Sequence, residues 1–527
     1  MVTYVVQLNP TVTEGSFETS VGAVADEWPD TVSPEPWRVF VGSGVPIWAI
    51  QGTGSRSPFA LSPASTEGIV TGVFPDQGGL WIQSLEPDDD AATSEGLFVQ
   101  LDASELDPAP VIGDYVIVRG KIRERSGQTM LNVASTEDVE VITGTFNMPV
   151  PVDLSPPRDE AESRAYYESL EGMLVQVSAP APAVGPTSQY GETPLVLPSW
   201  GLDRVMRGDP KGMLIFADDG SSVTHVDRTT LPYAAKTGDL VADLIGPLAF
   251  TYENFKIQPI ITPTVVSEAV VLPSLAPLGP DAFSIATFNV ENFFDVLDPH
   301  PSSPERPSIK GYRARVEKAA ATIEAMGAPT IVGLQEVENV GILEDVAEHA
   351  LIAEYGYVPV LIEGFDSRGI DVGYLVRGDQ ATLEGVSQHD APEGLTSRPP
   401  LMITVTVHLA SGDQKVTVLN NHFLSMSGGE LPTEPRRVAQ AAWNVSLVES
   451  LLAGDPDAQI VVLGDLNSVY NSPPLDVLRE AGLHHVYESV EPALPYTYIY
   501  QGESETLDHI LVSRALYNHL RQVDALH

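Results

Sequence analysis

The sequence contains no cysteine, which excludes disulfide bridges, thiolate zinc sites and cysteine nucleophiles. Basic residues are scarce as well: 28 Lys and Arg stand against 72 Asp and Glu, giving a formal net charge of −44 at pH 7. Such a surface repels polyanions at low ionic strength, so a nucleic-acid partner would need divalent cations, high salt or a local cluster of arginines. The acidic composition fits a salty habitat and simple solubility equally well.

Long apolar runs are also absent. No stretch of about 18 uninterrupted apolar residues occurs, so no membrane-spanning helix is expected. The opening MVTYVVQLNP lacks the basic and apolar regions of a signal peptide, so either the protein is not exported or its signal lies outside this sequence. With 527 residues, of which 43% are apolar, we expect a globular chain of two to four domains.

The first half of the chain alternates apolar and polar residues in two similar blocks. The stretches 67–85 and 113–132 predict pairs of strands around short turns, and the same plan returns at 171–177 and 238–260. A repeat about 125 residues apart predicts a duplicated small barrel.

The predicted barrels are OB-like and occupy residues 61–145 and 165–265, after a β-rich segment at 1–60 with no clear pattern. OB-like barrels often bind nucleic acid, but the shortage of basic residues favours a spacer or scaffold role. Residues 266–282 are rich in proline and small residues, which predicts a linker between domains.

From residue 283 onward, strands alternate with amphipathic helices, and many strands are apolar on both faces. Helices are expected at 312–327 and 434–454, the second with an apolar stripe made of Val438, Ala442, Val445 and Val448. This pattern predicts an α+β fold, a layered αβ sandwich over residues 283–527.

Polar side chains follow one predicted strand after another in this half of the chain. They are Asn289 and Glu291; Glu336 and Glu338; Asn420, Asn421 and His422; Asp465 and Asn467; and Asp508 and His509. One such group is an ordinary turn, but five on separate strands of one domain predict a shared cleft. Asp465 and Asn467 leave their strand on the same face, whereas His509 should point away from Asp508. Carboxylate and amide oxygens suit Mg²⁺, Mn²⁺ or Ca²⁺ better than zinc.

Six motifs in this region occur in a recognisable order: TFNVENFFD, GLQEVEN, TSRPPL, NNHFLS, VVLGDLNS and TLDHILVS. Together they resemble the endonuclease/exonuclease/phosphatase superfamily, a four-layered αβ sandwich related to pancreatic deoxyribonuclease. The order of domains, with AIQGTGSRSP and EGIVTGVF upstream, is similar to that of bacterial extracellular nucleases. The resemblance implies a secreted, metal-dependent nuclease that uses Mg²⁺ or Mn²⁺, with Ca²⁺ as a further option, and that cleaves DNA in preference to RNA.

The resemblance also implies roles for residues that match the motifs. Glu336 matches the principal metal-binding carboxylate, and Asn289 matches an amide that helps to hold the metal and the phosphate. Asp465 and Asn467 match the pair that orients the attacking water and contacts the scissile phosphate. His422 matches one of two histidines at the phosphate.

Three further positions match less strictly. Asp508 matches a carboxylate that supports the metal site or the second histidine, and Arg398 matches a phosphate-contacting arginine. Asp371 is expected to orient His422. Structural alternatives remain open for each type of residue: turn formers for the asparagines, an ion pair for Glu336, a packed imidazole for the histidine and a surface position for the arginine.

The family pattern ends with Ser-Asp-His on a final strand, whereas this sequence stops at RQVDALH soon after LDHILVS. We therefore expect a truncated domain that lacks its last strand and second histidine, with weak activity or none as it stands. Two alternatives stay open: a hydrolase of the same fold acting on a phospholipid or small phosphate ester, and a non-catalytic nucleic-acid-binding protein. No obligate protein partner is indicated.

Overall fold

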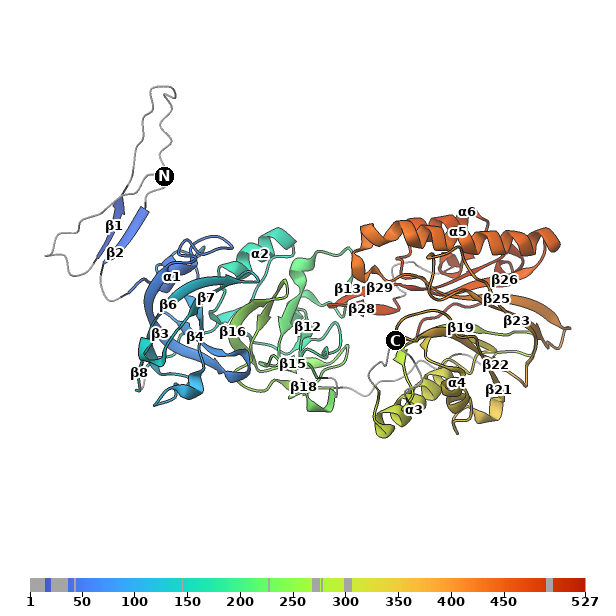
Figure 1. The fold of residues 1–527 in the computed structure, drawn as a ribbon, viewed down its shortest axis with the longest axis horizontal. Helices are drawn as coiled ribbons and strands as arrows, with labels where there is room; N and C mark the ends of the chain where they lie inside the picture. Colours follow the sequence, from blue (N-terminus) through green and yellow to red (C-terminus); the bar gives the residue numbers. More distant parts are fainter. Residues whose placement is uncertain are drawn as a thin grey trace, which may run out of the picture. The chain divides into compact units, whose positions relative to one another are not determined.

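The computed structural model describes residues 44–144, 146–225, 228–267, 275, 278–297, 306–489 and 496–526, with the backbone of β1 (Gly15–Thr19) and β2 (Trp37–Val41). Most of the segment 1–60 and of the predicted linker 266–282 lies outside these residues. The chain divides into two compact units, residues 1–269 with 500–503 and residues 270–499 with 504–527 (Figure 1).

The first unit begins with a short helix, α1 (Ile47–Gln51), and a six-stranded sheet. The strands are β3 (Pro63–Phe74), β4 (Gly79–Gln83), β5 (Gly96–Gln100), β6 (Tyr115–Arg125), β7 (Gln128–Asn132) and β8 (Val139–Ile142). Because β3 pairs with both β4 and β6, the pairings run β3–β4–β5–β7–β6 and return to β3. Alternate residues of these strands point inward and form one apolar core.

A second β-rich module follows in the same unit. Its elements are β9 (Val152–Asp153), α2 (Glu160–Glu168), β10 (Leu174–Val177), β11 (Ala181–Pro182), β12 (Thr193–Leu195), β13 (Val205–Met206), β14 (Ile215–Ala217), β15 (Leu240–Ala242), β16 (Leu244–Thr251), β17 (Asn254–Ile257) and β18 (Thr264–Val266). The pairings run β10–β16–β17–β14–β12, and a bridge between Ala183 and Leu195 connects the stretch after β11 with β12. The strand connectivity of the first module is thus repeated.

The two modules of this unit share an apolar interface. Phe74, Trp81, Phe98 and Met130 of the first module pack with Ala249 of the second, and all five are buried. The backbones also meet closely, since a Cβ on Gly96 would lie 1.9 Å from the carbonyl carbon of Gly172. The outer aromatic residues of the first module are therefore covered by its neighbour.

The second unit contains two sheets that face each other. The first sheet has the order β19 (Ile285–Phe293), β20 (Ile331–Val337), β22 (Asp371–Arg377), β21 (Tyr357–Leu361). The second has the order β23 (Ala381–Gln388), β24 (Leu401–Val407), β25 (Gln414–His422), β26 (Gln459–Asp465), β30 (Asp508–Val512), β27 (His484–His485). The strands β28 (Tyr498–Tyr500) and β29 (Glu503–Glu505) precede β30, and α7 (Arg514–Tyr517) follows it.

Helices cover the outer face of each sheet (Figure 1). The helices α3 (Ile309–Ala325) and α4 (Val340–Ala347) pack on the first sheet, and α5 (Glu430–Gly454) and α6 (Pro473–Glu480) pack on the second. Between the sheets, the Tyr374 hydroxyl donates to a backbone carbonyl oxygen, with Leu401 O at 2.8 Å and Val418 O at 2.9 Å. The αβ sandwich predicted from the sequence is therefore confirmed. Within the described residues, no helix is both long and apolar enough to cross a membrane.

Candidate active site

Strand pairing brings the predicted polar residues to one end of the sandwich. In the second sheet, His422 lies opposite Asp465 in the parallel pair β25–β26, and Asp465 lies opposite Asp508 in the antiparallel pair β26–β30. The facing sheet supplies Asn289 from β19 and Glu336 from β20.

The Asn289 amide joins the two sheets at this point. Its Nδ2 donates to Asp465 Oδ2 at 3.0 Å and to Glu336 Oε1 at 3.4 Å, while its Oδ1 accepts from the backbone N–H of Glu291. The nitrogen, rather than the oxygen, thus faces the carboxylates. This contact supports the prediction that Asn289 belongs to the site, whereas its role as a metal ligand stays a prediction.

Two residues of the site have a left-handed backbone, which non-glycine residues adopt at a cost. Glu336 has φ 65° at a register shift in β20, and its Oε2 accepts from the backbone N–H of Asn292 at 2.7 Å. Asn467 has φ 45°; its N–H donates to Asp465 Oδ1 at 2.8 Å and its Nδ2 to Phe423 O at 3.1 Å. These bonds fix both side chains at the ends of their strands.

The glycine that precedes Asp465 is required by a close backbone approach. Gly464 has φ 132°, and a Cβ at this position would lie 1.9 Å from the backbone oxygen of Asn421. Only glycine allows β26 to run this close to β25 at that conformation. The Gly-Asp-Leu-Asn sequence is therefore both a strand end and a part of the site.

Ionisation of the buried carboxyl groups of the site is costly. Burial, and then the neighbouring Asp508, raise the pKa of Asp465 to about 8. Burial also raises the pKa of Asp508 to about 6, and the charge of Glu336 adds to this effect. One oxygen of Asp508 is buried without a hydrogen-bond partner among the described residues. The site thus holds more buried acid than the protein itself neutralises.

His422 lies against these carboxylates. Its Nε2 is 3.7 Å from both Glu336 Oε1 and Asp465 Oδ2, and its side chain is 2% exposed. Burial, followed by the charges of Arg398 and Arg368, lowers the pKa of His422 well below its usual value. The imidazole is therefore neutral at pH 7, and it can accept or donate a single proton.

Arg398 lies near the site, and its role as a phosphate contact stays a prediction. It is buried, and its guanidinium donates to Asp366 Oδ2 at 2.6 Å, to His422 O at 3.3 Å and to Phe423 O at 3.0 Å. These bonds hold the strand end that carries His422. The same carboxylate of Asp366 lies 3.6 Å from Nε of Arg368, whose side chain is 49% exposed.

Asp371 is buried at the start of β22, and its Oδ1 accepts from the backbone N–H of Gly364 at 2.7 Å. Burial raises its pKa to about 7. No hydrogen bond joins Asp371 to His422 in the described part of the chain, where His422 Nδ1 is buried and has no partner. The orienting role predicted for Asp371 therefore has no contact to support it.

The buried face of α5 is more polar than expected from the sequence. The predicted apolar stripe is wrong at Ala442, which is exposed. The residues that face the sheet are Arg437, Gln440, Ala441, Asn444 and Val448. Gln440 accepts from the backbone N–H of Leu424 at 3.0 Å and donates to Leu395 O at 3.1 Å. In the sequence, this face is indicated by Arg437, Gln440 and Asn444, which follow one another at intervals of three and four residues.

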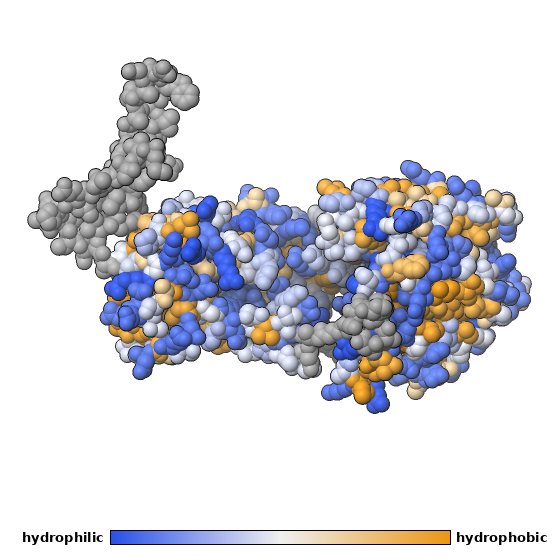
Figure 2. Space-filling model, viewed as in Figure 1, coloured by the Kyte–Doolittle hydropathy of each residue, from blue (hydrophilic) through white to orange (hydrophobic). Residues whose placement is uncertain are grey.

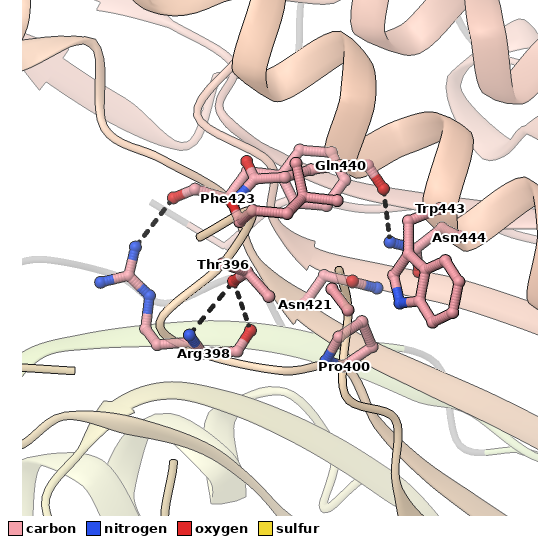
Figure 3. A pocket seen from close by; sticks show the side chains of 10 residues that line it. Thr396, Arg398, Pro400, Asn421, Phe423, Gln440, Trp443 and Asn444 are labelled. Carbon is pink, nitrogen blue, oxygen red and sulfur yellow. Dashed lines mark hydrogen bonds between the residues drawn. The ribbon is translucent and has the colours of Figure 1, made fainter. Parts of the chain in front are cut away.

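Behind the strand end that carries His422, α5 and the segment 391–400 enclose a small pocket (Figure 3). Asn421, Trp443 and Asn444 are among the residues that line it. Since neighbouring residues on a strand point to opposite faces, Asn421 points away from the carboxylates that His422 faces. The pocket therefore supports the site from behind and does not form part of the cleft.

The residues present fit a hard divalent cation. The candidate donors are carboxylate oxygens of Glu336 and Asp508, and Oδ1 of Asp508 is buried without a hydrogen-bond partner among the described residues. Among the described residues, no group of three or more His, Asp or Glu side chains is arranged to hold a metal ion by itself. Mg²⁺ sites in proteins often use one or two carboxylates and complete their coordination with water and substrate phosphate.

Two family models match the chain. Residues 284–524 match the model described as the endonuclease/exonuclease/phosphatase family, and residues 152–268 match a domain of unknown function. No curated protein matches the chain significantly.

Several solved structures are similar to part of the chain. D. rerio TDP2 complexed with a single-strand DNA product shows 19% identity and a TM-score of 0.32 over 44% of this chain and 83% of its own. The mannosyl-6-phosphatase of Bacteroides thetaiotaomicron shows 18% identity and a TM-score of 0.34 over 44% and 86%. The human Nocturnin catalytic domain with bound sulfate shows 16% identity and a TM-score of 0.30 over 42% and 81%.

Proposed function

Since the C-terminal part of this chain is an endonuclease/exonuclease/phosphatase family domain, we propose that the protein is a metal-dependent phosphodiester hydrolase that cleaves nucleic acid, with DNA preferred to RNA. The observation that carries the proposal is the meeting of polar side chains from both sheets around the Asn289 amide, which contacts Glu336 and Asp465. Phosphodiesters resist water because they are anionic, so such a site must offset charge and position a nucleophile.

The residues divide these tasks. Glu336 and Asp508 would hold Mg²⁺ or Mn²⁺, which supplies positive charge that offsets the charge of the phosphodiester. In its ionised form Asp465 accepts a proton from the attacking water, and Asn467 holds the scissile phosphate in line with it. His422, which is neutral and buried beside both carboxylates, donates a hydrogen bond to a phosphoryl oxygen. The water oxygen forms the new bond to phosphorus as the phosphorus–oxygen bond to the leaving group breaks, and the leaving oxygen takes up a proton from solvent.

The arginines are assigned by exposure. Arg398 donates three hydrogen bonds, to Asp366 and to the backbone oxygens of His422 and Phe423, so we assign it a positioning role. Arg368, half exposed and beside the same Asp366, contacts the anionic substrate. Replacing Arg368 by Gln should raise KM about tenfold, the value of one charge-assisted hydrogen bond. Arg514→Gln, which removes an exposed arginine after the far end of β30, is the control. Equal KM values for the two variants would reject this assignment.

The N-terminal modules are proposed to be OB-like barrels that act as a scaffold. The support is the repeated strand connectivity, in which β3 pairs with both β4 and β6. The aromatic residues Trp81 and Phe98, which could stack on bases, are buried against the second module. We place the protein outside the cell on the resemblance of its domain order alone, which fractionation of the native host would test.

The substrate is tested by presenting the full chain with Mg²⁺ and four phosphodiesters: plasmid DNA, RNA, a phospholipid and bis(p-nitrophenyl) phosphate. We expect weak but measurable cleavage of DNA, at a higher kcat/KM than of the other three. Turnover of the phospholipid or the small ester without DNA cleavage would favour a non-nuclease hydrolase. DNA binding in EDTA without turnover after Mg²⁺ is restored would favour a non-catalytic binding protein.

A further inference from the structure

Two buried histidines form a hydrogen-bonded chain next to the candidate active site. The backbone N–H of Tyr487 lies 3.1 Å from His485 Nδ1, and His485 Nε2 lies 2.8 Å from His509 Nδ1. His509 Nε2 in turn lies 2.6 Å from the backbone oxygen of Ser468. Both histidine side chains are almost fully buried, so neither has water as an alternative partner.

The partners at the two ends of this hydrogen-bonded chain determine which nitrogen of each imidazole carries a proton. A backbone N–H can only donate, so His485 Nδ1 carries no proton, and the single proton of the neutral ring lies on Nε2. A backbone carbonyl can only accept, so His509 Nε2 carries the proton that it donates to Ser468. His509 Nδ1 then accepts from His485. Both rings are therefore neutral Nε2–H tautomers, and the chain runs in one direction from Tyr487 to Ser468.

The chain ends at the turn that carries the site. Ser468 follows Asn467, whose φ of 45° needs support from its surroundings. His509 follows Asp508 and lies opposite Gly464 in the pair β26–β30. One hydrogen bond to the Ser468 carbonyl thus connects the strand that carries Asp508 with the turn that presents Asn467.

We propose that His485 and His509 are positioning residues that hold the Asn467 turn in its catalytic conformation. This inference rests on the proposed function, because it assigns Asn467 to the scissile phosphate. His485 orients His509, and His509 holds Ser468. Neither histidine touches the substrate. No pattern in the sequence linked His509 with His485, because the two histidines are 24 residues apart and show no shared spacing.

The first test uses the wild-type protein and does not depend on activity. In ¹⁵N-labelled full-length protein, both imidazoles should show the chemical shifts of a neutral Nε2–H tautomer at pH 7. Their slowly exchanging Nε2 protons should be visible in water. A charged ring, or an Nδ1–H tautomer for either residue, would overturn the chain.

The second test separates position from packing. His509→Leu removes the donor to Ser468 and should lower kcat about 100-fold at unchanged KM, as expected for a displaced catalytic turn. His509→Gln keeps a donor at a similar distance and should recover most of that loss. His484→Gln, at the partly exposed neighbouring histidine, is the control and should leave kcat unchanged.

The outcomes distinguish this inference from the proposed function. An active wild type with full kcat in His509→Leu would overturn the positioning role alone. Equal losses in the Leu and Gln variants would assign His509 a packing role only. A wild type that cleaves no phosphodiester with Mg²⁺ would overturn both the positioning role and the proposed function. If His509→Leu fails to fold, the recovery in His509→Gln and the ¹⁵N shifts decide the question.

Discussion

At the scale of single residues, the site is dominated by acids that lack a cation. Asp465 lies opposite Asp508 on neighbouring strands, and Glu336 from the other sheet adds a third negative charge. The nearby Arg398 already donates three hydrogen bonds, to Asp366 and to two backbone oxygens, and His422 is neutral. The protein therefore tolerates an electrostatic cost here that a bound divalent cation would remove.

This electrostatic cost falls when the carboxyl groups are protonated or when a cation binds. The stability of the protein should therefore depend on pH and on metal. In metal-free protein the raised pKa values let Asp465 and Asp508 hold protons in the folded state that the unfolded chain releases above about pH 4, so the contribution of these two groups to stability should fall as pH rises from 5 to 8. Added Mg²⁺ or Mn²⁺ should raise Tm more at pH 8 than at pH 5. Thermal melts of Asp508→Asn should show a weaker pH dependence than wild type.

Asp457→Asn, at an exposed carboxylate, is the control for this prediction and should melt with the wild-type pH dependence. Because Asp371 also has a raised pKa, the decisive quantity is the difference in the pH dependence of Tm between wild type and Asp508→Asn. A metal-induced rise in Tm that is equal at both pH values would contradict the account of Asp465 and Asp508.

Sequence patterns predicted which residues would meet but not how each would be bonded. Asn289, Glu336, His422 and Asp465 were found because each ends an apolar run, and the ends of strands in facing sheets come together. The bonds of Arg398 could not be foreseen, because Asp366 comes from a loop with no periodic signal. Partners contributed by loops depend on tertiary packing rather than on local pattern.

At the scale of elements, the register between β25 and β26 places the site. Their parallel pairing runs from Val416 opposite Gln459 to His422 opposite Asp465. A shift of one residue would turn every side chain of one strand to the other face. The conformation of Gly464 at the close approach to Asn421 therefore helps to fix which side chains reach the cleft.

Gly464→Ala tests this register. The new Cβ would meet the backbone oxygen of Asn421 at 1.9 Å and would occupy a left-handed conformation, so we expect a loss of more than about 2 kcal/mol in unfolding free energy. Gly482→Ala is the control: it has φ 87° with no atom within 4 Å, so it reports backbone strain alone, about 1 kcal/mol. Urea unfolding gives both values. Equal losses would show that the close approach contributes nothing.

The strands and helices of the C-terminal half were predictable because their apolar periodicity is strong over long segments. The buried face of α5 was not, since Gln440 and Asn444 are polar and the expected stripe was drawn through apolar residues. Gln440 binds the backbone of two loops, at Leu395 and Leu424, whereas Asn444 donates to the backbone oxygen of Gln440 within the helix. The sequence alone does not show where those loops run.

At the scale of the whole molecule, charge sets the conditions under which the protein works. The formal charge of −44 is spread over a surface on which hydrophilic residues dominate the visible face, with smaller hydrophobic patches (Figure 2). Self-repulsion lowers the stability of so acidic a chain, and the same field opposes the approach of DNA. Dissolved cations should therefore favour both folding and substrate binding.

Added salt should stabilise the protein. Raising NaCl from about 0.05 to 1 M shortens the Debye length from more than about 10 Å to about 3 Å and screens the repulsion. We expect Tm to rise on the order of 5 °C, measured by calorimetry at pH 7 without divalent cations. Sucrose, which acts by exclusion from the surface without screening charge, serves as the comparison. A Tm that stays constant or falls in NaCl would show that the charges are already balanced locally.

The central claim is that a hard cation at Glu336 allows this domain to hydrolyse phosphodiesters. The most direct measurement is Mg²⁺-dependent cleavage of DNA by wild type and by Glu336→Gln, with the melting curve of each taken in EDTA. We expect Glu336→Gln to reduce cleavage to the level of a control without enzyme, while its Tm in EDTA stays close to that of wild type. Undiminished cleavage by Glu336→Gln would contradict the claim.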